Sequence, residues 1–447
     1  MRLLQIVKNP NSVKKGANKM HLSPFLYQTC WIILGPLIRL YLYMRIKQKK
    51  EDKYRIKERF GKGYRSVRPE GILIWLHAVS LGECKAAINL VMKLQDMRTD
   101  WHFLITTNTI TAAEHIKKNC AFMPVTHAFQ PLDHPKWVSY FLTYWKPDSA
   151  IFLESDFWFN MVTQTKKKQL PLIFASSQIS ESAKRRWEKN PLIARKLFSS
   201  PSLILATDNE QKMYFEQLAG FTEGNSKQKV IVTGSLKSRV SESTSDTAYE
   251  EALKEYAKQA RCKIILAAST HEYEEDLIAK TVSRLSDVGQ FLLIFAPRHP
   301  HRAAEIISQL GTMPRRSKGE LPQPNNRYFL SDTLGEMTGL YNAADIIILG
   351  GSFFSSGGHN PIEPSLTGTP IICGKSIYKN KADYKVLLEA GIIRQVDSTQ
   401  TLGKTIVETL QTTKALERAI NKGQKIAQEA CMRPVKASHY IISTIEK

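Results

Sequence analysis

Short apolar runs alternate with amphipathic stretches of helical length from residue 71 onward. An apolar run of about four to six residues is typical of a strand buried on both faces, as in a parallel sheet covered by helices. In the first half of the chain the pattern predicts strands at Ile72–Leu76, Phe103–Thr106, Ala150–Leu153, Leu172–Ala175, Leu203–Ala206 and Val230–Thr233.

A second series of strands follows the polar linker Ser241–Tyr249. Two such series predict an α/β protein with two Rossmann-like domains facing a cleft, because ligands of these sheets bind beyond the carboxyl ends of the strands. We expect a first domain at residues 51–228 and a second at 229–447, with the final helical region, 413–447, packing across both. The strands of the second series are expected at Ile264–Ala267, Phe291–Ala296, Tyr328–Leu330, Ile346–Leu349 and Pro370–Cys373.

The segment Phe25–Met44 is apolar over 20 residues and carries one charge, Arg39. This length is barely sufficient to span a bilayer, and Pro36 and Gln28 weaken the pattern. It predicts an N-terminal membrane-associated helix that spans the bilayer or lies in its interface; the alternative is a buried amphipathic helix of the first domain. We place this anchor and its basic flank at residues 1–50, outside the two domain cores. A basic cluster follows the segment and predicts that this side faces the cytoplasm: Arg45, Lys47, Lys49, Lys50, Lys53, Arg55, Lys57 and Arg59.

The net charge of +22 is unevenly distributed, because residues 1–70 hold 17 Lys and Arg but only 4 Asp and Glu. Basic charge fits nucleic acid, anionic lipid or an acidic substrate. No nucleic-acid-binding motif accompanies it, and it borders an apolar segment, so membrane lipid is the expected partner and nucleic acid is not. The cysteines form no C-x-x-C pair, which favours a reducing compartment over a disulfide framework or a zinc site: Cys30, Cys84, Cys120, Cys262, Cys373 and Cys431.

The first candidate for chemistry lies where the strand Ile72–Leu76 passes into a helix. Ser80 and Glu83 form an S-x-x-E capping box, which is a structural interpretation. A carboxylate at the carboxyl end of a strand also projects toward the ligand side of this fold. Near a helix N-terminus Glu83 would stay ionised, as a general base must be.

An acidic pair, Glu154 and Asp156, follows the strand Ala150–Leu153. Two carboxylates at this spacing could form a metal-binding pair, but one pair is weak support for a metal site. Lys237 follows the strand Val230–Thr233 and is a further candidate for chemistry. The alternative is that it is a solvated surface lysine.

A glycine-rich loop, 350–358, connects the strand Ile346–Leu349 to a predicted helix. Glycine lets backbone amides approach an anion, and Asn360 followed by Pro361 is typical of an N-cap and a first helical position. A helix N-terminus behind such a loop can bind phosphate, and Glu363 could accept hydrogen bonds from ribose. The alternative is a tight turn with an Asn-x-x-Glu capping pair.

Two further segments follow strands of the second series. In Pro297-Arg298-His299-Pro300, an arginine could hold phosphate in a bidentate fashion that a lysine could not reproduce. Ala268-Ser269-Thr270-His271-Glu272 joins a strand to a helix that is expected to begin near Glu272. His359, in the glycine-rich loop, is expected to anchor that loop as a structural residue.

These motifs resemble those of bacterial 3-deoxy-D-manno-octulosonic acid (Kdo) transferases, which are GT-B glycosyltransferases. The stretch from Trp75 to Glu83 resembles the family's W-x-H-x-x-S-x-G-E signature, and Glu154–Asn160 resembles its E-x-[ED]-x-W-x-N element. Thr233–Lys237 is similar to its G-N-L-K stretch, although Ser235 replaces the usual asparagine and Ser238-Arg239 replaces an aromatic–acidic pair. Seven motifs occur in family order over most of residues 60–440, which is more specific than one glycine-rich loop.

The resemblance implies roles for individual residues. Glu83 would deprotonate the acceptor hydroxyl, Lys237 would help to stabilise the transition state, and Glu154 and Asp156 would complete the catalytic group. The loop Thr333–Met337 resembles the family's loop whose backbone contacts the pyrimidine. The implied CMP-binding residues are Pro297, Arg298, Thr333, Leu334, Gly335, Glu336, Asn360, Pro361, Ile362 and Glu363, with a phosphate loop at Ser269, Gly357 and Gly358.

The resemblance also implies the reaction: transfer of Kdo from CMP-Kdo to an anionic lipid A precursor (lipid IVA) in lipopolysaccharide biosynthesis, by an inverting displacement. It places the enzyme at the cytoplasmic face of a Gram-negative inner membrane. Because CMP is a monophosphate, no metal need bridge a diphosphate, and neither a metal nor a cofactor is expected. The alternatives are a GT-B enzyme that uses a UDP-sugar, either a transferase or a 2-epimerase, and a non-catalytic membrane protein that binds lipid phosphate.

Overall fold

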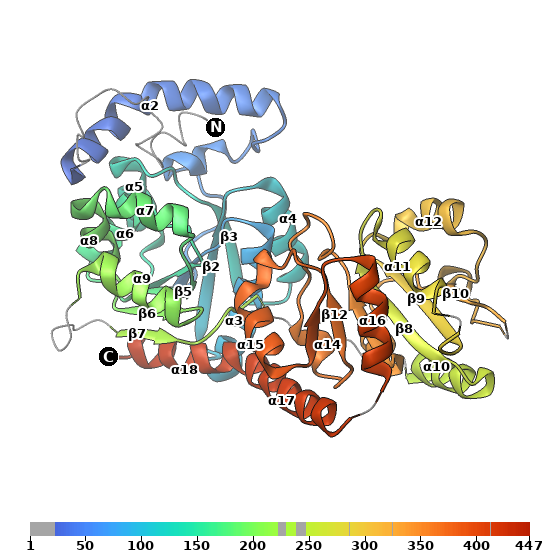
Figure 1. Ribbon diagram of the computed structural model, residues 1–447. Coiled ribbons are helices and arrows are strands. Elements are labelled where there is room, and N and C mark those ends of the chain that lie inside the picture. Colours follow the sequence, from blue (N-terminus) through green and yellow to red (C-terminus); the bar gives the residue numbers. More distant parts are fainter. Residues whose placement is uncertain (1–22, 222–228, 238–246, 286, 324, 412) are drawn as a thin grey trace, which may run out of the picture. The chain divides into compact units, whose positions relative to one another are not determined.

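The chain forms two compact units (Figure 1). The computed structural model describes residues 23–221, 229–237 and 247–447, apart from residues 286, 324 and 412. Unit 1 comprises Met1–Lys237 together with Met432–Lys447, and unit 2 comprises Ser238–Cys431. The departure from the family pattern at Ser238-Arg239 lies outside the described residues.

Unit 1 is built on a seven-stranded parallel sheet in the order β3-β2-β1-β4-β5-β6-β7. Side chains alternate across it as the period of two requires: Leu73 and Trp75 enter one hydrophobic core, and Ile74 and Leu76 enter the other. The strands are β1 (Ile72–His77), β2 (Trp101–Thr107), β3 (Val125–Phe129), β4 (Ser149–Leu153), β5 (Leu172–Ser177), β6 (Leu203–Ala206) and β7 (Lys229–Val232).

Helices cover both faces of this sheet. One core contains side chains of α5 (Pro135–Trp145), α6 (Phe159–Lys167), α8 (Pro191–Phe198) and α9 (Asn209–Ala219). The other contains side chains of α3 (Leu81–Met97), α4 (Ile110–Asn119) and α18 (Arg433–Ile445). The short helices η2 (Ile56–Phe60) and α7 (Glu181–Glu188) complete this part of the unit.

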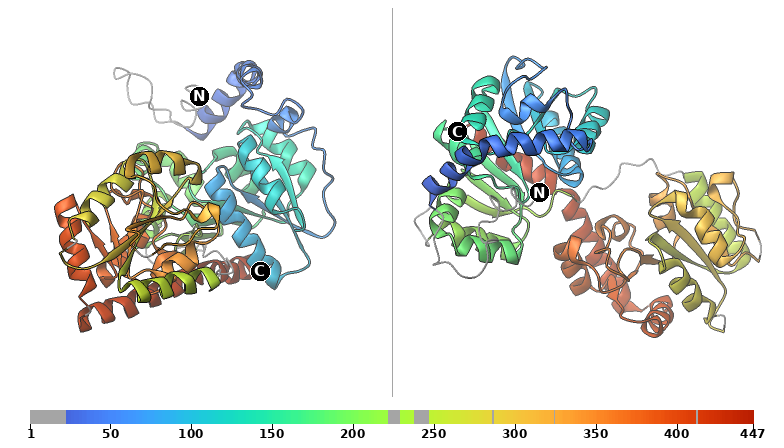
Figure 2. Two further views of the ribbon diagram at one scale, coloured as in Figure 1. Left: turned by 90° about the vertical axis from the view of Figure 1, so that its right-hand side faces the viewer. Right: turned by 90° about the horizontal axis from the view of Figure 1, so that it is seen from above.

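The apolar N-terminal segment forms α2 (Pro24–Lys47), which packs on unit 1 beside α5 (Figures 1 and 2). Four of its side chains are buried in the core shared with α5 and α6: Tyr27, Trp31, Ile38 and Leu42. Our expectation that this segment lies outside the domain cores is therefore wrong. Within the described residues, α2 alone has the length and apolar composition of a membrane span.

Unit 2 is built on a six-stranded parallel sheet in the order β10-β9-β8-β11-β12-β13. Its strands are β8 (Lys263–Thr270), β9 (Phe291–Pro297), β10 (Tyr328–Leu330), β11 (Ile346–Leu349), β12 (Ile371–Cys373) and β13 (Ile393–Gln395).

One face of this second sheet is covered by α10 (Thr247–Ala260), α13 (Met337–Ala343), α14 (Ile362–Ser365), α15 (Lys381–Ala390) and α17 (Lys414–Cys431). The other face is covered by α11 (Glu274–Ser283), α12 (Ala303–Leu310) and α16 (Thr399–Leu410). Three short helices lie in the connections: η3 (Pro300–Arg302), η4 (Arg316–Lys318) and η5 (Tyr378–Asn380).

Two parallel-sheet, Rossmann-like domains confirm the predicted α/β fold class. Strands β3 and β13 were not predicted, and the boundary at residue 229 was wrong, because β7 is the edge strand of the first sheet. Helix α11 begins at Glu274, two residues later than expected. The final helix, α18, belongs to unit 1.

Candidate active site

Glu83 lies in the first turn of α3, directly after the carboxyl end of β1. Its Oε2 accepts hydrogen bonds from the amides of Val79 (2.5 Å) and Ser80 (3.2 Å), and its own amide donates to Ser80 Oγ (3.3 Å). Both halves of the predicted capping box are present. The cap fixes the Glu83 carboxylate at the edge of the sheet where this fold binds ligands.

The electrostatic environment of Glu83 differs from our expectation. Burial and then the charge of Glu154 raise the pKa of Glu83 above its ordinary value of 4.5, and together they outweigh the Val79 amide that lowers it. The helix N-terminus of α3, which we expected to keep Glu83 ionised, therefore does not determine the direction of its pKa shift. A carboxylate with a raised pKa accepts a proton more readily, which suits a general base.

Glu154 and Lys237 form an ion pair near Glu83. The Lys237 ammonium lies 2.5 Å from Glu154 Oε2, and its Cε lies 3.6 Å from the position that a Cβ on Gly82 would occupy. Glu154 is buried and has a left-handed backbone with φ of +60°. Its Oε1 has no hydrogen-bond partner in the described part of the chain. The fold thus brings Glu83, Glu154 and Lys237 together.

Asp156 has a different set of partners. Its Oδ2 accepts a hydrogen bond from Trp158 Nε1 (2.6 Å) and lies 3.1 Å from His77 Nε2. His77 Nδ1 in turn lies 3.0 Å from Thr106 Oγ1. We did not predict roles for His77 and Thr106, although His77 stands in the motif that we quoted. These contacts make Asp156 the centre of a buried polar network and do not offer its carboxylate, with that of Glu154, as a metal-binding pair.

In unit 2, the glycine-rich loop is organised by Glu274, which the motif search did not single out. The buried Glu274 carboxylate accepts hydrogen bonds from the amides of Gly351 (2.8 Å), His271 (2.9 Å) and Phe353 (3.1 Å). The sequence offered a weak signal for this role, because Glu274 lies three residues after His271, whose amide it binds. The Glu274 carboxylate therefore accepts hydrogen bonds from amides that a phosphate would otherwise use.

The two glycines predicted to bind phosphate also have internal partners. The Gly357 amide donates to Ser376 Oγ (3.1 Å), and the Gly358 amide donates to the carbonyl of Gly351 (2.6 Å). Gly357 has φ of +86°, and a Cβ there would lie 2.6 Å from Cζ of Tyr378. The loop therefore needs these glycines for its own packing. The helix after it, α14, has only 4 residues, so its dipole is small.

Arg298 lies directly after β9, where its amide donates to the carbonyl of Thr270 (3.0 Å) and its side chain is exposed. His271 and His359 lie at the same edge with stacked rings and an Nε2–Nε2 distance of 3.0 Å. Burial, then His271 and Arg298, lower the pKa of His359 to about 4. The edge thus combines an exposed guanidinium with neutral imidazoles, and Ser269 lies beside them at the end of β8 with φ of +54°.

Glu363 lies half-buried in α14, and burial raises its pKa. Among the described residues, no hydrogen bond or ion pair to its carboxylate is found. Asn360 Oδ1 accepts a hydrogen bond from the amide of Ile362 (3.0 Å), while Pro361 and Ile362 are buried. The prediction that Asn360 is the N-cap was wrong by one residue, because Pro361 is the N-cap of α14 and Asn360 bonds the helix start from one position earlier. The reciprocal bond from Glu363 that a full capping pair requires is not found among the described residues.

The loop after β10 carries the residues predicted to contact the pyrimidine. Glu336 is bound by the Arg316 guanidinium (2.7 and 2.9 Å) and by the hydroxyl of Thr333. Leu334 is exposed, and Gly335 has φ of +94°. The Glu336 side chain is thus committed to the loop itself, so a ligand would contact this loop through its backbone. Pro297, the remaining predicted residue, is buried at the end of β9.

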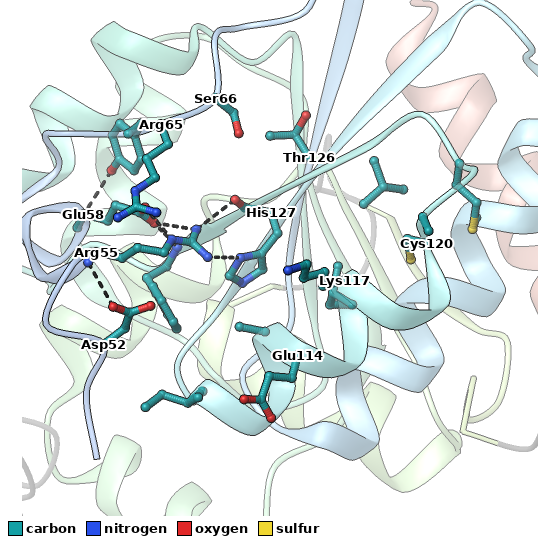
Figure 3. Close-up of a pocket in the computed structure, with 18 of the residues that line it drawn as sticks. Asp52, Arg55, Glu58, Arg65, Ser66, Glu114, Lys117, Cys120, Thr126 and His127 are labelled. Atoms are coloured by element: carbon teal, nitrogen blue, oxygen red, sulfur yellow. Dashed lines mark hydrogen bonds and ion pairs between the residues drawn. The ribbon is translucent and has the colours of Figure 1, made fainter. Parts of the chain in front are cut away.

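A pocket of about 620 Å³ lies elsewhere in unit 1, between α4, β3 and the segment around η2 (Figure 3). Arg55 crosses it and contacts Glu58 and His127, while Arg65 and Lys117 also line its wall. None of the predicted site residues lines this pocket. The candidate site is therefore defined by the ends of the strands and not by this pocket.

Sequence comparisons agree with the motifs. A family profile described as "3-Deoxy-D-manno-octulosonic-acid transferase (kdotransferase)" matches residues 54–240. The 3-deoxy-D-manno-octulosonic acid transferase of Haemophilus influenzae is 30% identical over 411 residues, covering 91% of this chain and 95% of its own. A probable mitochondrial 3-deoxy-D-manno-octulosonic acid transferase of Arabidopsis thaliana is 33% identical over 78% of this chain and 79% of its own.

Solved structures show the same fold at low sequence identity. A glycosyltransferase from Rickettsia africae has a TM-score of 0.54 and 14% identity, with 85% of this chain and 100% of that chain covered. The UDP-GlcNAc 2-epimerase of Neisseria meningitidis, bound to UDP-GlcNAc, has a TM-score of 0.54 and 14% identity, with 84% of this chain and 99% of that chain covered. These neighbours support the GT-B architecture.

Proposed function

This chain belongs to the 3-deoxy-D-manno-octulosonic acid (Kdo) transferase family of glycosyltransferases, and on that premise we propose that it transfers Kdo from CMP-Kdo to an anionic lipid A precursor. The observation that supports the chemistry best is the Glu83 carboxylate, which is held by two amides and has a raised pKa. A positioned base of this kind typically contributes about 10²–10⁴ in rate.

The proposed reaction is a single inverting displacement. The acceptor hydroxyl oxygen attacks the anomeric carbon of Kdo, its proton passes to Glu83, and the bond from that carbon to the CMP phosphate oxygen breaks. The charge of Glu154 favours this proton transfer, because it raises the pKa of Glu83. Lys237, held by Glu154, supplies positive charge to the transition state.

Unit 2 is proposed to bind the donor. Arg298 has the exposed guanidinium that a bidentate phosphate contact needs. Because the amides of Gly357 and Gly358 have internal partners, we assign the leaving phosphate to Arg298 and to Ser269 ahead of those amides. The half-buried Glu363 carboxylate is suited to accept hydrogen bonds from the ribose hydroxyls, and the backbone of Thr333–Glu336 is suited to the cytosine. No metal or cofactor is needed to neutralise a monophosphate.

The acceptor and the location complete the proposal. A phosphorylated lipid A precursor is anionic and membrane-embedded, and the basic residues that follow α2 would attract it. We therefore propose that the enzyme works at the cytoplasmic face of the inner membrane and that α2 contributes to membrane attachment.

Incubation of the purified full-length protein with CMP-Kdo and lipid IVA tests the proposal. We expect mass spectrometry to show lipid IVA carrying one or more Kdo residues, with one CMP released per Kdo transferred. Transfer by Glu83→Gln should be slower by about 10²–10⁴. UDP-GlcNAc with the same acceptor serves as the control donor. Absence of Kdo transfer, together with tighter binding of UDP than of CMP in calorimetry, would show that the chain uses a UDP-sugar instead.

A further inference from the structure

Helix α2 has two apolar faces with different surroundings. Its buried positions, Tyr27, Trp31, Gly35, Ile38 and Leu42, recur every three or four residues and form one stripe against unit 1. A second stripe of large apolar side chains faces away from the unit and is exposed. It consists of Phe25, Ile32, Ile33, Leu37, Leu40, Tyr43 and Met44.

The inner stripe is fixed to unit 1 near both ends of the helix. In the first turns, the Tyr27 hydroxyl donates to Asp133 Oδ2 (2.8 Å) and Gln28 Nε2 donates to Asn160 Oδ1 (3.1 Å). In the last turn, Arg45 Nε lies 2.9 Å from Glu51, whose carboxylate also binds the buried Arg59 at 2.9 Å. A helix held along its length in this way cannot be surrounded by lipid, so spanning the bilayer would require breaking these contacts.

The outer stripe ends in a basic surface. Lys47, Lys49, Lys50 and Lys53 are exposed directly after it, and the Lys47 ammonium lies 5.0 Å from the centre of the Tyr43 ring. An apolar face bordered by an aromatic ring and lysines matches the boundary between acyl chains and anionic headgroups. The apolar stripe and the adjoining positive charge together favour an anionic bilayer as the occupant of this face.

We infer that α2 lies in the plane of the membrane, with its outer stripe in the interface of an anionic bilayer and its inner stripe docked on unit 1. This inference rests on the proposed function only in taking the partner to be the membrane that carries the acceptor. It replaces a transmembrane anchor by an interfacial one, in which the start and end of α2 lie on the same side of the bilayer.

The docked face also connects α2 to the candidate catalytic residues. Trp31 packs edge-on against Trp158 at 6.2 Å between ring centres, and Trp158 Nε1 donates to Asp156. Asp133, held by Tyr27, accepts the amides of Asn160 and Met161 at the start of α6. Helix α2 therefore acts as a positioning element for the segment that holds Asp156. Its removal would expose a buried surface, although the sequence analysis placed residues 1–50 outside the two domain cores.

Separate substitutions on the two faces test the inference. In flotation with vesicles of phosphatidylethanolamine and phosphatidylglycerol, the outer-face variant Ile33→Lys/Leu37→Lys/Leu40→Lys should lose at least tenfold in bound fraction. It should keep the wild-type melting temperature and its activity on detergent-dispersed lipid IVA. The matched inner-face variant Tyr27→Phe should keep vesicle binding but melt at a lower temperature. Unchanged vesicle binding by the outer-face variant would overturn the inference.

Topology distinguishes the interfacial helix from a spanning one. The full chain carries a protease-cleavable epitope tag before Met1 and is expressed in a Gram-negative host. We expect protease to remove the tag in inverted inner-membrane vesicles and to spare it in intact spheroplasts. The reverse pattern would establish a spanning helix. Kdo transfer measured in the same vesicles reports separately on the proposed function: correct topology without transfer would refute the function and leave the interfacial helix standing.

Discussion

The two roles of Glu83, as helix cap and as general base, can be separated by three substitutions. Glu83→Gln keeps an oxygen that can accept the Val79 and Ser80 amides but cannot take a proton at neutral pH. Ser80→Ala removes the other half of the capping box and leaves the Glu83 carboxylate in place. Glu83→Ala removes both functions. If the proposed mechanism is correct, stability and rate should respond to different members of this set.

The structure sets the expected magnitudes. Loss of a serine cap costs about 0.5–2 kcal/mol. For a unit of this size, each kcal/mol lowers the melting temperature by roughly 2–4 °C. Ser80→Ala should therefore melt a few degrees lower and keep most of its kcat. Glu83→Gln should lose about 10²–10⁴ in kcat. Glu83→Ala should show both losses.

The raised pKa of Glu83 predicts whether Glu83→Gln is more or less stable than the wild type. Because the pKa is raised in the folded protein, the ionised carboxylate destabilises the fold at neutral pH, and this cost disappears as the pH falls below its ordinary value of 4.5. Glu83→Gln should therefore melt at or above the wild-type temperature at neutral pH, with the difference shrinking toward acid. Differential scanning calorimetry and a mass-spectrometric transfer assay measure the two properties. A Glu83→Gln enzyme that retains more than about a tenth of wild-type kcat would refute the general-base role.

Other substitutions extend the test to the remaining residues. Glu154→Gln should shift the acid limb of the pH–kcat profile to lower pH, because the charge of Glu154 raises the pKa of Glu83; an unshifted limb would remove Glu154 from the mechanism. Arg298→Lys should weaken CMP binding in calorimetry by about tenfold, the value of one lost bidentate contact. Arg302→Lys, whose partners are Glu275 and Glu305, is the control and should change stability instead. Glu363→Gln should cost about 1.5–3 kcal/mol in CMP binding, and the loss should vanish with a 2′,3′-dideoxy analogue of CMP.

The strands that the sequence predicted and those that it did not differ in the continuity of their apolar runs, because the edge strands β7 and β10 were predicted and the edge strands β3 and β13 were not. Central strands such as β1 and β11 are covered on both faces, so their residues are apolar in an unbroken run. The two missed strands, β3 and β13, are edge strands. β3 reads Val-Thr-His-Ala-Phe and β13 reads Ile-Arg-Gln, because one side of each meets solvent or a polar neighbour. A search for apolar runs therefore finds edge strands such as β7, which reads Lys-Val-Ile-Val, and β10, which reads Tyr-Phe-Leu, but overlooks edge strands whose apolar run is interrupted.

The site was predictable where its interactions are local. The capping box joins residues three apart, so its spacing is visible in the sequence. The raised pKa of Glu83 was not predictable, because it depends first on burial and then on Glu154, which follows another strand of the sheet. The internal hydrogen bonds of the glycine-rich loop were not predictable for the same reason, because Glu274, which binds the Gly351 amide, lies 77 residues earlier in the chain. Motifs identify which residues meet, but the partners brought in by the fold decide how they are charged.

Helix α2 shows that an average hydropathy has the same limitation as a motif, because neither shows what a residue contacts in the fold. A helix that is apolar all round is interpreted as a membrane span, because a hydropathy average measures how much apolar surface there is and not what each face contacts. In α2 the two stripes carry different constraints. The inner stripe meets fixed partners, such as Asp133 against Tyr27 and Trp158 against Trp31, so it requires particular shapes and one hydroxyl group. If the outer stripe meets lipid, which conforms to any apolar shape, it requires only hydrophobicity. Exchanges among leucine, isoleucine and phenylalanine at Ile33 or Leu40 should then be tolerated. Replacement of Trp31 by any of these three residues should not.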